Sequence, residues 1–307
     1  MVVVVFISMY ALGDPTEVLI APDASQEVRD KLKQELCLDR PLHEQFFYCF
    51  VGNVLHGNLG ISFVHDVSAT QLIFDRLPAT LELAICALLL AIFIGIPLGM
   101  LAGLKPQSPI GKGIMTGSVL GFSLPTFWVG LMLILLFAVT LKWLPAGGRG
   151  ETVQILGMQF SFLTRDGLIH LLLPAVNLAL FKIALVIRLS RAGTMEVVHQ
   201  DYIKFARAKG LSTPRIVFLH MLKNILIPII TVLGIEFGSL IAFSVVTETV
   251  FRWPGIGSLL IQSIAKLDRP VVVAYLLLVV FMFILINLVV DVVYSILDPR
   301  VRLGGRS

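Results

Sequence analysis

Three charged side chains stand inside long apolar stretches of the sequence. They are Lys182, Glu236 and Asp291. A charge within a membrane span is strongly destabilising unless it faces protein or water. These residues therefore either line a substrate path or pair one helix with another, for instance Lys182 with Glu236. For Asp291, which follows Asn287 by one helical turn, we favour helix pairing.

A basic segment between two apolar stretches, residues 201–228, is a second candidate site. Its pattern predicts a helix, a sharp turn and a second short helix. Gly210 can adopt the left-handed conformation that closes a helix, Ser212 or Thr213 can cap the next one, and Pro214 suits its first position.

The first of these two helices is suited to docking on a partner. Lys204 and Arg207 share one face, and the small residues Ala206, Ala208 and Gly210 leave the backbone open to close approach. A connector that is basic only because cytoplasmic loops generally are explains the composition as well. A helix-turn-helix reader of DNA is disfavoured, because hydrophobic stretches crowd both ends of the segment.

A third candidate is the aromatic turn at residues 247–257. Phe251 and Trp253 are suited to an interface, and Pro254 with two neighbouring glycines forces a turn. An aromatic anchor at the membrane surface accounts for these residues as well as a partner-facing loop does.

Motifs for nucleotide, hydrolase and metal chemistry are missing from the sequence. Gly111-Lys112-Gly113 lacks the spacing of a phosphate-binding loop, and Cys37, Cys49 and Cys86 have no metal-ligand spacing. Cys37 and Cys49 share one segment and could pair. If ATP drives this protein, we expect the ATPase to be another chain.

These candidate residues must be positioned by helices within a membrane. The chain is 57% hydrophobic and only 14% charged, which a single globular core cannot accommodate. After a short apolar run at residues 1–12, five full-length spans are predicted, at residues 79–104, 114–141, 168–190, 225–249 and 271–297. Lysine and arginine in the short loops place residues 201–223 and the C-terminus in the cytoplasm and residues 13–78 outside.

The basic segment resembles the cytoplasmic coupling loop of permease subunits of bacterial ABC importers, in the dipeptide, oligopeptide and nickel branch. Lys204, Phe205 and Lys223 depart from the general pattern of such loops and favour this branch over sugar or amino-acid permeases. The matching residues are Asp201, Tyr202, Ile203, Ala206, Arg207, Ala208, Lys209, Gly210, Leu211, His220, Leu222, Asn224 and Pro228.

Other segments extend the resemblance over nearly the whole chain. Gly13-Asp14-Pro15 matches the end of a longer first helix in the family, so we expect the start of this chain to be missing or misassigned. Pro78 to Glu82 matches the start of the second helix. The aromatic turn resembles a periplasmic gate loop, with matches at Glu248, Phe251, Trp253, Pro254, Gly255 and Gly257.

The resemblance implies an all-α integral membrane protein with the type I ABC importer permease fold and about six transmembrane helices, the first short or truncated here. Residues 1–307 would form one domain, with a periplasmic segment at 13–78, a coupling loop at 191–223 and a gate loop at 250–270. The chain would be multi-pass in the bacterial inner membrane and would not be an enzyme.

The implied function is to form half of a path for peptides. The implied partners are a second homologous permease, two ATP-binding subunits and a periplasmic substrate-binding protein, with no nucleic acid. No cofactor would be bound by this chain, since ATP and Mg²⁺ would be used by the ATP-binding subunit. The alternative is a secondary transporter or channel that acts without an ATPase partner, which would show inverted repeats that this sequence lacks.

Overall fold

The computed structural model describes residues 3, 6–7, 26–35, 38–155 and 157–297. The motif Gly13-Asp14-Pro15, most of the first apolar run, and the Cys37–Cys49 pairing therefore lie outside the described residues. Before the long helices come α3 (Gln26–Glu35), α4 (Leu42–Glu44), a π-helical stretch (Gln45–Val51) and α5 (Gly52–Leu55).

Long apolar helices dominate the rest of the chain, as the sequence predicts. Four of them are long and apolar enough to cross a membrane, at Ala69–Leu104, Arg165–Val197, Thr213–Val250 and Arg269–Val292. The first two are α6 (Ala69–Leu104) and α9 (Arg165–Val197). The third is formed by α11 (Thr213–Arg215), a π-helical stretch (Ile216–Met221) and α12 (Leu222–Val250), and the fourth lies within α14 (Arg269–Leu297). Each extends beyond the apolar stretch that identified it.

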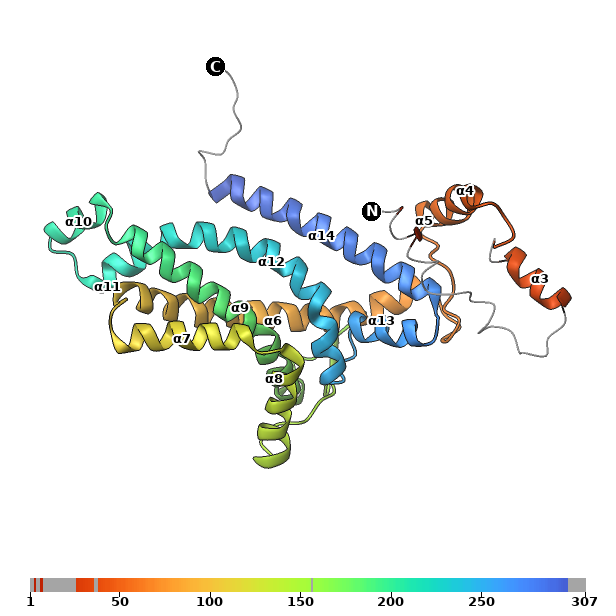
Figure 1. The fold of residues 1–307 in the computed structure, drawn as a ribbon, viewed down its shortest axis with the longest axis horizontal. Helices are drawn as coiled ribbons and strands as arrows, with labels where there is room; N and C mark the ends of the chain where they lie inside the picture. Colours follow the sequence, from red (N-terminus) through yellow and green to blue (C-terminus); the bar gives the residue numbers. More distant parts are fainter. Residues whose placement is uncertain (1–2, 4–5, 8–25, 36–37, 156, 298–307) are drawn as a thin grey trace, which may run out of the picture.

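The predicted third span, residues 114–141, is not one straight helix. It is divided into α7 (Pro109–Ser123) and α8 (Thr126–Leu133), and α8 continues as a π-helical stretch (Ile134–Thr140). The helix axis bends by 104° between the two parts, at a break that contains Pro125. Proline lacks the backbone N–H needed to continue the helix, and it disfavours the helical conformation at the residue before it. In Figure 1, α8 stands across the direction of the other long helices.

Two hydrophobic cores hold the bundle together. One lies toward the end that carries α13 (Ile256–Ala265) and includes Leu83, Leu171 and Trp253. The other lies toward the end that carries α10 (Asp201–Ala208) and includes Met100 and Ile203. α10 and α13 occupy opposite ends of the molecule (Figure 1).

A row of glycines brings α6 and α9 into close contact. Gly95, Gly99 and Gly103 recur every fourth residue, so they share one face of α6. A Cβ at Gly99 would lie 2.5 Å from the Ile187 carbonyl oxygen, and one at Gly103 would lie 2.6 Å from Thr194 Cβ. Only residues without a Cβ permit this approach, as in other membrane helix pairs with small residues at this spacing.

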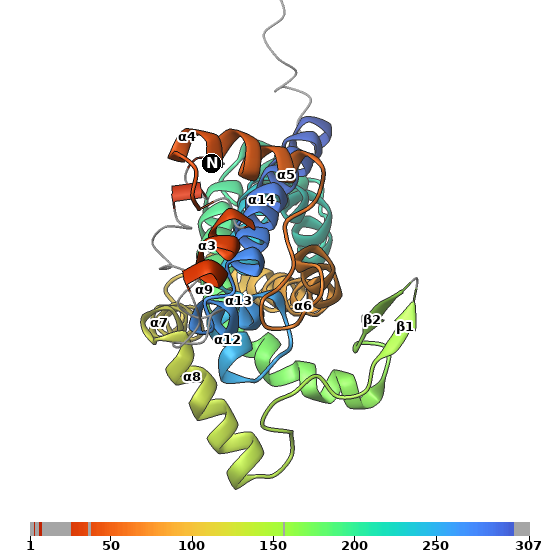
Figure 2. The ribbon, with the colours of Figure 1, turned by 90° about the vertical axis from the view of Figure 1, so that its right-hand side faces the viewer.

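A small hairpin lies between α8 and α9 in the chain. Its strands β1 (Val153–Ile155) and β2 (Met158–Phe160) pair antiparallel, with Gln154 opposite Gln159. Figure 2 shows that this hairpin projects away from the helices. The loop that contains it is fixed to the bundle by the polar contacts described below.

Candidate functional site

The predicted docking helix is α10, and a defined turn ends it. Gly210 has φ +74°, as the sequence predicts. The Gly210 N–H donates to the Arg207 carbonyl at 2.9 Å, and the Leu211 N–H donates to the Ala206 carbonyl at 3.3 Å. These two bonds are those of a Schellman motif, which satisfies the last carbonyls of a helix. The Ser212 side chain makes no capping bond, and α11 continues directly into the next span instead of forming a separate short helix.

One face of α10 packs on the chain's own core. Ile203 is fully buried and Ala206 is 6% exposed, and both belong to the core that includes Met100. Ala206 therefore does not face a partner, contrary to our expectation, whereas Ala208 is exposed. The Asn224 amide fixes the helix from the side, because it donates to the Tyr202 hydroxyl at 2.8 Å.

The opposite face of this segment is exposed, and it is both apolar and cationic. Phe205 is 62% exposed, and Lys209 Nζ lies 4.6 Å from the centre of its ring. Phe218 and Leu219, in the stretch after α11, are 71% and 58% exposed. Arg207 is exposed as well. Large apolar side chains beside cations, outside the core of the chain, are typical of a surface that a partner protein covers.

The surroundings of two titratable side chains of α10 shift their pKa values. The hydrogen bond from Lys204 to Asp201, 2.8 Å long, lowers the pKa of Asp201. Asp201 also lies in the first turn of α10, where a negative charge is favourable. Burial raises the pKa of Tyr202. His220 is partly buried, and its backbone carbonyl accepts a hydrogen bond from Asn224 at 2.8 Å.

The aromatic turn lies inside the protein, contrary to our expectation of partner-facing side chains. Phe251 and Trp253 are both 0% exposed. Trp253 Nε1 donates to the Ala79 carbonyl at 2.8 Å, and the Phe251 carbonyl accepts from Gly148 N–H at 2.9 Å. The turn packs against α6 at Ala79, so its aromatic side chains fill the core instead of anchoring in the membrane surface.

Glu248 is the polar centre of this turn. Its carboxylate is fully buried and accepts from Thr80 Oγ1 at 2.7 Å, Ser244 Oγ at 2.9 Å and Ser258 N–H at 2.8 Å. These donors come from α6, α12 and α13. Gly255, Gly257 and Pro254 form the connection around it, and a Cβ at Gly255 would lie 2.4 Å from the Glu248 carboxyl group. The segment thus joins α6, α12 and α13.

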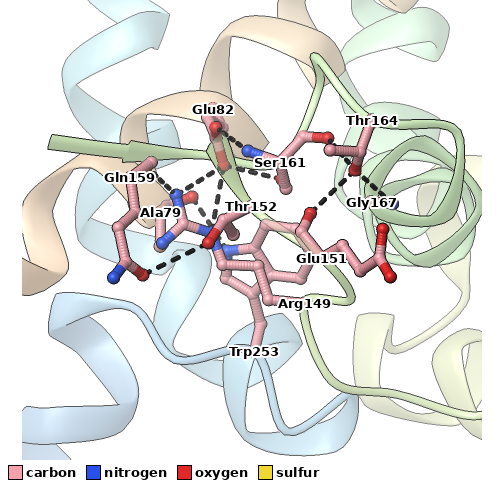
Figure 3. Close-up of polar contacts among 10 residues, drawn as sticks. All are labelled: Ala79, Glu82, Arg149, Glu151, Thr152, Gln159, Ser161, Thr164, Gly167 and Trp253. Atoms are coloured by element: carbon pink, nitrogen blue, oxygen red, sulfur yellow. Dashed lines mark hydrogen bonds and ion pairs between the residues drawn. The ribbon is translucent and has the colours of Figure 1, made fainter. Parts of the chain in front are cut away.

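A second buried carboxylate, Glu82, fixes the loop that carries the hairpin (Figure 3). Arg149 donates to Glu82 Oε2 at 2.9 Å through Nη2 and at 3.2 Å through Nε. The Ser161 backbone N–H donates to the same carboxylate at 2.6 Å, and its hydroxyl at 2.8 Å. Our sequence analysis noted Glu82 only as part of a motif and did not assign it a partner. The only hint in the sequence was the position of this acidic residue close to the start of the predicted apolar span 79–104.

The same loop is joined to the start of α9. Thr164 Oγ1 accepts from Gly167 N–H at 2.9 Å and donates to the Glu151 carbonyl at 2.7 Å, and both contacts are visible in Figure 3. The loop therefore connects α6, at Glu82, with the start of α9.

The structure places the three intramembrane charges in different surroundings. Lys182 forms an ion pair with Glu236, as we considered, and it also donates to Ser239 Oγ at 2.9 Å. Asp291 is exposed and makes no ion pair or hydrogen bond within the described part of the chain, so the helix pairing that we favoured for it is not seen. Within those residues, no group of three or more His, Cys, Asp and Glu side chains could hold a metal ion.

Comparisons with known proteins agree with this fold. The chain is 41% identical over 303 residues to the Di/tripeptide transport system permease protein DppB of Pseudomonas aeruginosa (strain UCBPP-PA14), covering 94% of this chain and 90% of that protein. It is 38% identical over 293 residues to the Oligopeptide transport system permease protein AppB of Bacillus subtilis (strain 168), covering 95% and 90%.

A solved structure shares the fold. An inward-facing conformation of the MetNI methionine ABC transporter matches with a TM-score of 0.60 at 17% identity, over 74% of this chain and 97% of that chain. Residues 95–303 match the model of the family described as "Binding-protein-dependent transport system inner membrane component". With its long apolar helices and these relatives, the chain is a multi-pass membrane permease, and it belongs to the family of binding-protein-dependent transport system inner membrane components.

Proposed function

We propose that this chain is the permease subunit of an ATP-driven importer and forms half of the path that moves dipeptides or oligopeptides across the bacterial inner membrane. Its relatives carry the names of dipeptide, tripeptide and oligopeptide permeases, at 36% to 41% identity over most of the chain. The other half of the path is a second homologous permease. A periplasmic binding protein delivers the peptide.

The observation that carries this proposal is the exposed face of α10. Phe205 projects from a short helix, with Lys209 beside its ring, and that helix is held in place by Ile203 on its buried side and by the Schellman turn at its end. A preformed helix with one large aromatic side chain fits a groove on a partner, because little conformational freedom is lost on binding. We assign that groove to an ATP-binding subunit, two of which serve the complete transporter.

The proposed coupling mechanism follows from how α10 is connected. Only residues 198–200 separate it from α9, and α11 leads from its other side into α12. When the ATP-binding subunits close on ATP and Mg²⁺, α10 moves with them, and the attached spans turn the path from one side of the membrane to the other. This chain binds no cofactor in this scheme.

The test is reconstitution in proteoliposomes with the partner subunits and the binding protein. The wild-type complex should take up a dipeptide only with ATP. Phe205→Ser should weaken binding of the ATP-binding subunit by about 30-fold, if Phe205 is an interface hot spot of about 2 kcal/mol. Phe162→Ser, at an exposed aromatic side chain of the outer loop, should leave that binding unchanged. A wild-type complex that imports without ATP, or imports no peptide, would reject the proposal.

A further inference from the structure

A continuous cluster of charged and aromatic side chains lies within the spans, apart from the docking face. Lys182, which pairs with Glu236, lies 5.3 Å from the centre of the Phe181 ring. Phe181 stacks on Phe122 of α7 at 4.3 Å between ring centres. Arg188 covers Phe122, with Cζ 4.7 Å from the ring centre. Helices α7, α9 and α12 all contribute to this cluster.

Arg188 is the unbalanced charge of the cluster. It is partly buried, and within the described residues it makes no ion pair and no hydrogen bond. Its five N–H donors are therefore open to a ligand, with the planar guanidinium held over an aromatic ring. Since Glu236 balances Lys182, the cluster carries one positive charge in excess.

Arg188 lies near the end of the apolar stretch 168–190, where a cation is unfavourable unless it faces protein or water. It lies nine residues before the last residue of α9, Val197, which corresponds to about 13 Å along the helix. The neighbouring residue, Ile187, packs against Gly99, which lies within the span formed by α6. Charged side chains at such depth almost always face the interior of a bundle or a water-filled path, where they meet a partner.

The broken span points to a water-filled path at the same place. Phe122 is the penultimate residue of α7, and Leu124 and Pro125, which form the break, are exposed on this chain. Irregular backbone at membrane depth is tolerated only where protein covers it or where it lines an aqueous cavity. In transporters, broken helices typically form the substrate site. The break and the open arginine therefore mark one location.

We propose that Arg188, stacked on Phe122, is a binding point for the terminal carboxylate of the transported peptide. This inference rests on the proposed function. A guanidinium donates two parallel hydrogen bonds to a carboxylate, so it selects peptides with a free C-terminus. The Lys182–Glu236 pair stands at the other end of the aromatic stack and is neutral, so Arg188 supplies the charge that attracts the carboxylate.

The experiment uses the purified complex with its permease and ATP-binding partners in lipid nanodiscs, without the binding protein. Binding of alanyl-alanine and of its C-terminal amide is measured by saturation-transfer difference NMR. The wild-type complex should bind the free dipeptide at least tenfold more tightly than the amide. Arg188→Gln should remove that difference by weakening only the free dipeptide, and Arg188→Lys should retain part of it.

Arg165→Gln is the matched control, because Arg165 is an exposed arginine at the outer end of the same helix. It should bind both ligands as the wild type does. Equal binding of dipeptide and amide by the wild type, or wild-type discrimination by Arg188→Gln, would overturn the inference. So would dissociation of the complex on Arg188→Gln, which would mean that Arg188 holds the subunits together instead of binding the peptide.

ATP-driven uptake is measured separately, on the same complex reconstituted in proteoliposomes with the binding protein, to separate the two proposals. A wild-type complex without uptake contradicts the proposed function itself. A complex that takes up dipeptide normally but shows no dependence on Arg188 contradicts only the binding point.

Discussion

Replacement of Gly210 tests whether α10 must be held in place to work. A Cβ at Gly210 would meet no atom within 4 Å, so crowding adds nothing to the effect of a substitution. What remains is the backbone conformation, φ +74°, which is unfavourable for L-residues by about 1–2 kcal/mol and more so for a β-branched one. Gly210→Ala should thus lower the population of the capped helix about fivefold, and Gly210→Val about 30-fold or more.

The effect should appear where α10 contacts its partner. Affinity for the purified ATP-binding subunit, the ATPase rate of the complex and dipeptide uptake should all fall in the order Gly210, Ala, Val. Gly210→Asn should be milder than Gly210→Ala, since asparagine tolerates the left-handed conformation. Membrane insertion should not change, because Gly210 lies outside every span.

Gly57 provides the matched control. It has φ +69° and likewise no atom within 4 Å of an added Cβ, but it lies before α6, in the region predicted to be outside. Gly57→Val should strain the backbone equally and leave the affinity for the ATP-binding subunit unchanged. If Gly210→Val binds that subunit with wild-type affinity and supports normal uptake, the segment is only a basic connector and the coupling argument fails.

Three further predictions follow from the outer contacts and the orientation. Trp253→Ala should lower the free energy of unfolding of the purified chain by about 3–5 kcal/mol, because a fully buried indole is lost. If Trp253 were only an anchor in the membrane surface, the substitution would leave that free energy unchanged. Glu82→Ala should lower the free energy of unfolding by about 3–5 kcal/mol, because it leaves Arg149 buried without its anion. Adding Arg149→Met should recover most of that loss. A double variant as unstable as Glu82→Ala alone would contradict the pairing argument. In a background without native cysteines, an impermeant reagent outside intact cells should label a cysteine at the exposed residue Ser68 but not one at Ser212, and the reverse result would invert the orientation.

The spans could be predicted because hydrophobicity is local in the sequence. Their ends could not, because polar turns continue the helices beyond the apolar stretch: α6 begins at Ala69, ten residues before the predicted start, across Asp75 and Arg76. Proline disfavours the helical conformation at the residue before it, so Pro125 permits a bend, but the angle of 104° depends on what α8 packs against.

At the candidate sites too, local features could be predicted from the sequence, whereas contacts between residues far apart in the chain could not. The conformation of Gly210 was predicted because it depends on its immediate neighbours. The partner of Glu82 lies 67 residues later in the chain, and no spacing rule connects the two. Aromatic side chains such as Phe251 and Trp253 suit a membrane surface and a core equally well, so only the tertiary fold could decide that they are buried.

The three glycines that bring α6 and α9 into close contact should make the two helices move as one rigid body. With backbone against backbone at Gly95, Gly99 and Gly103, there is no layer of flexible side chains to absorb a sliding motion. A 33-residue helix such as α9 is about 50 Å long, so a tilt of about 10° imposed at its α10 end sweeps its far end through about 9 Å. Because α6 packs against α9 without intervening side chains, we expect a small rotation at α10 to displace both helices, and with them the loop that Glu82 and Thr164 join to them.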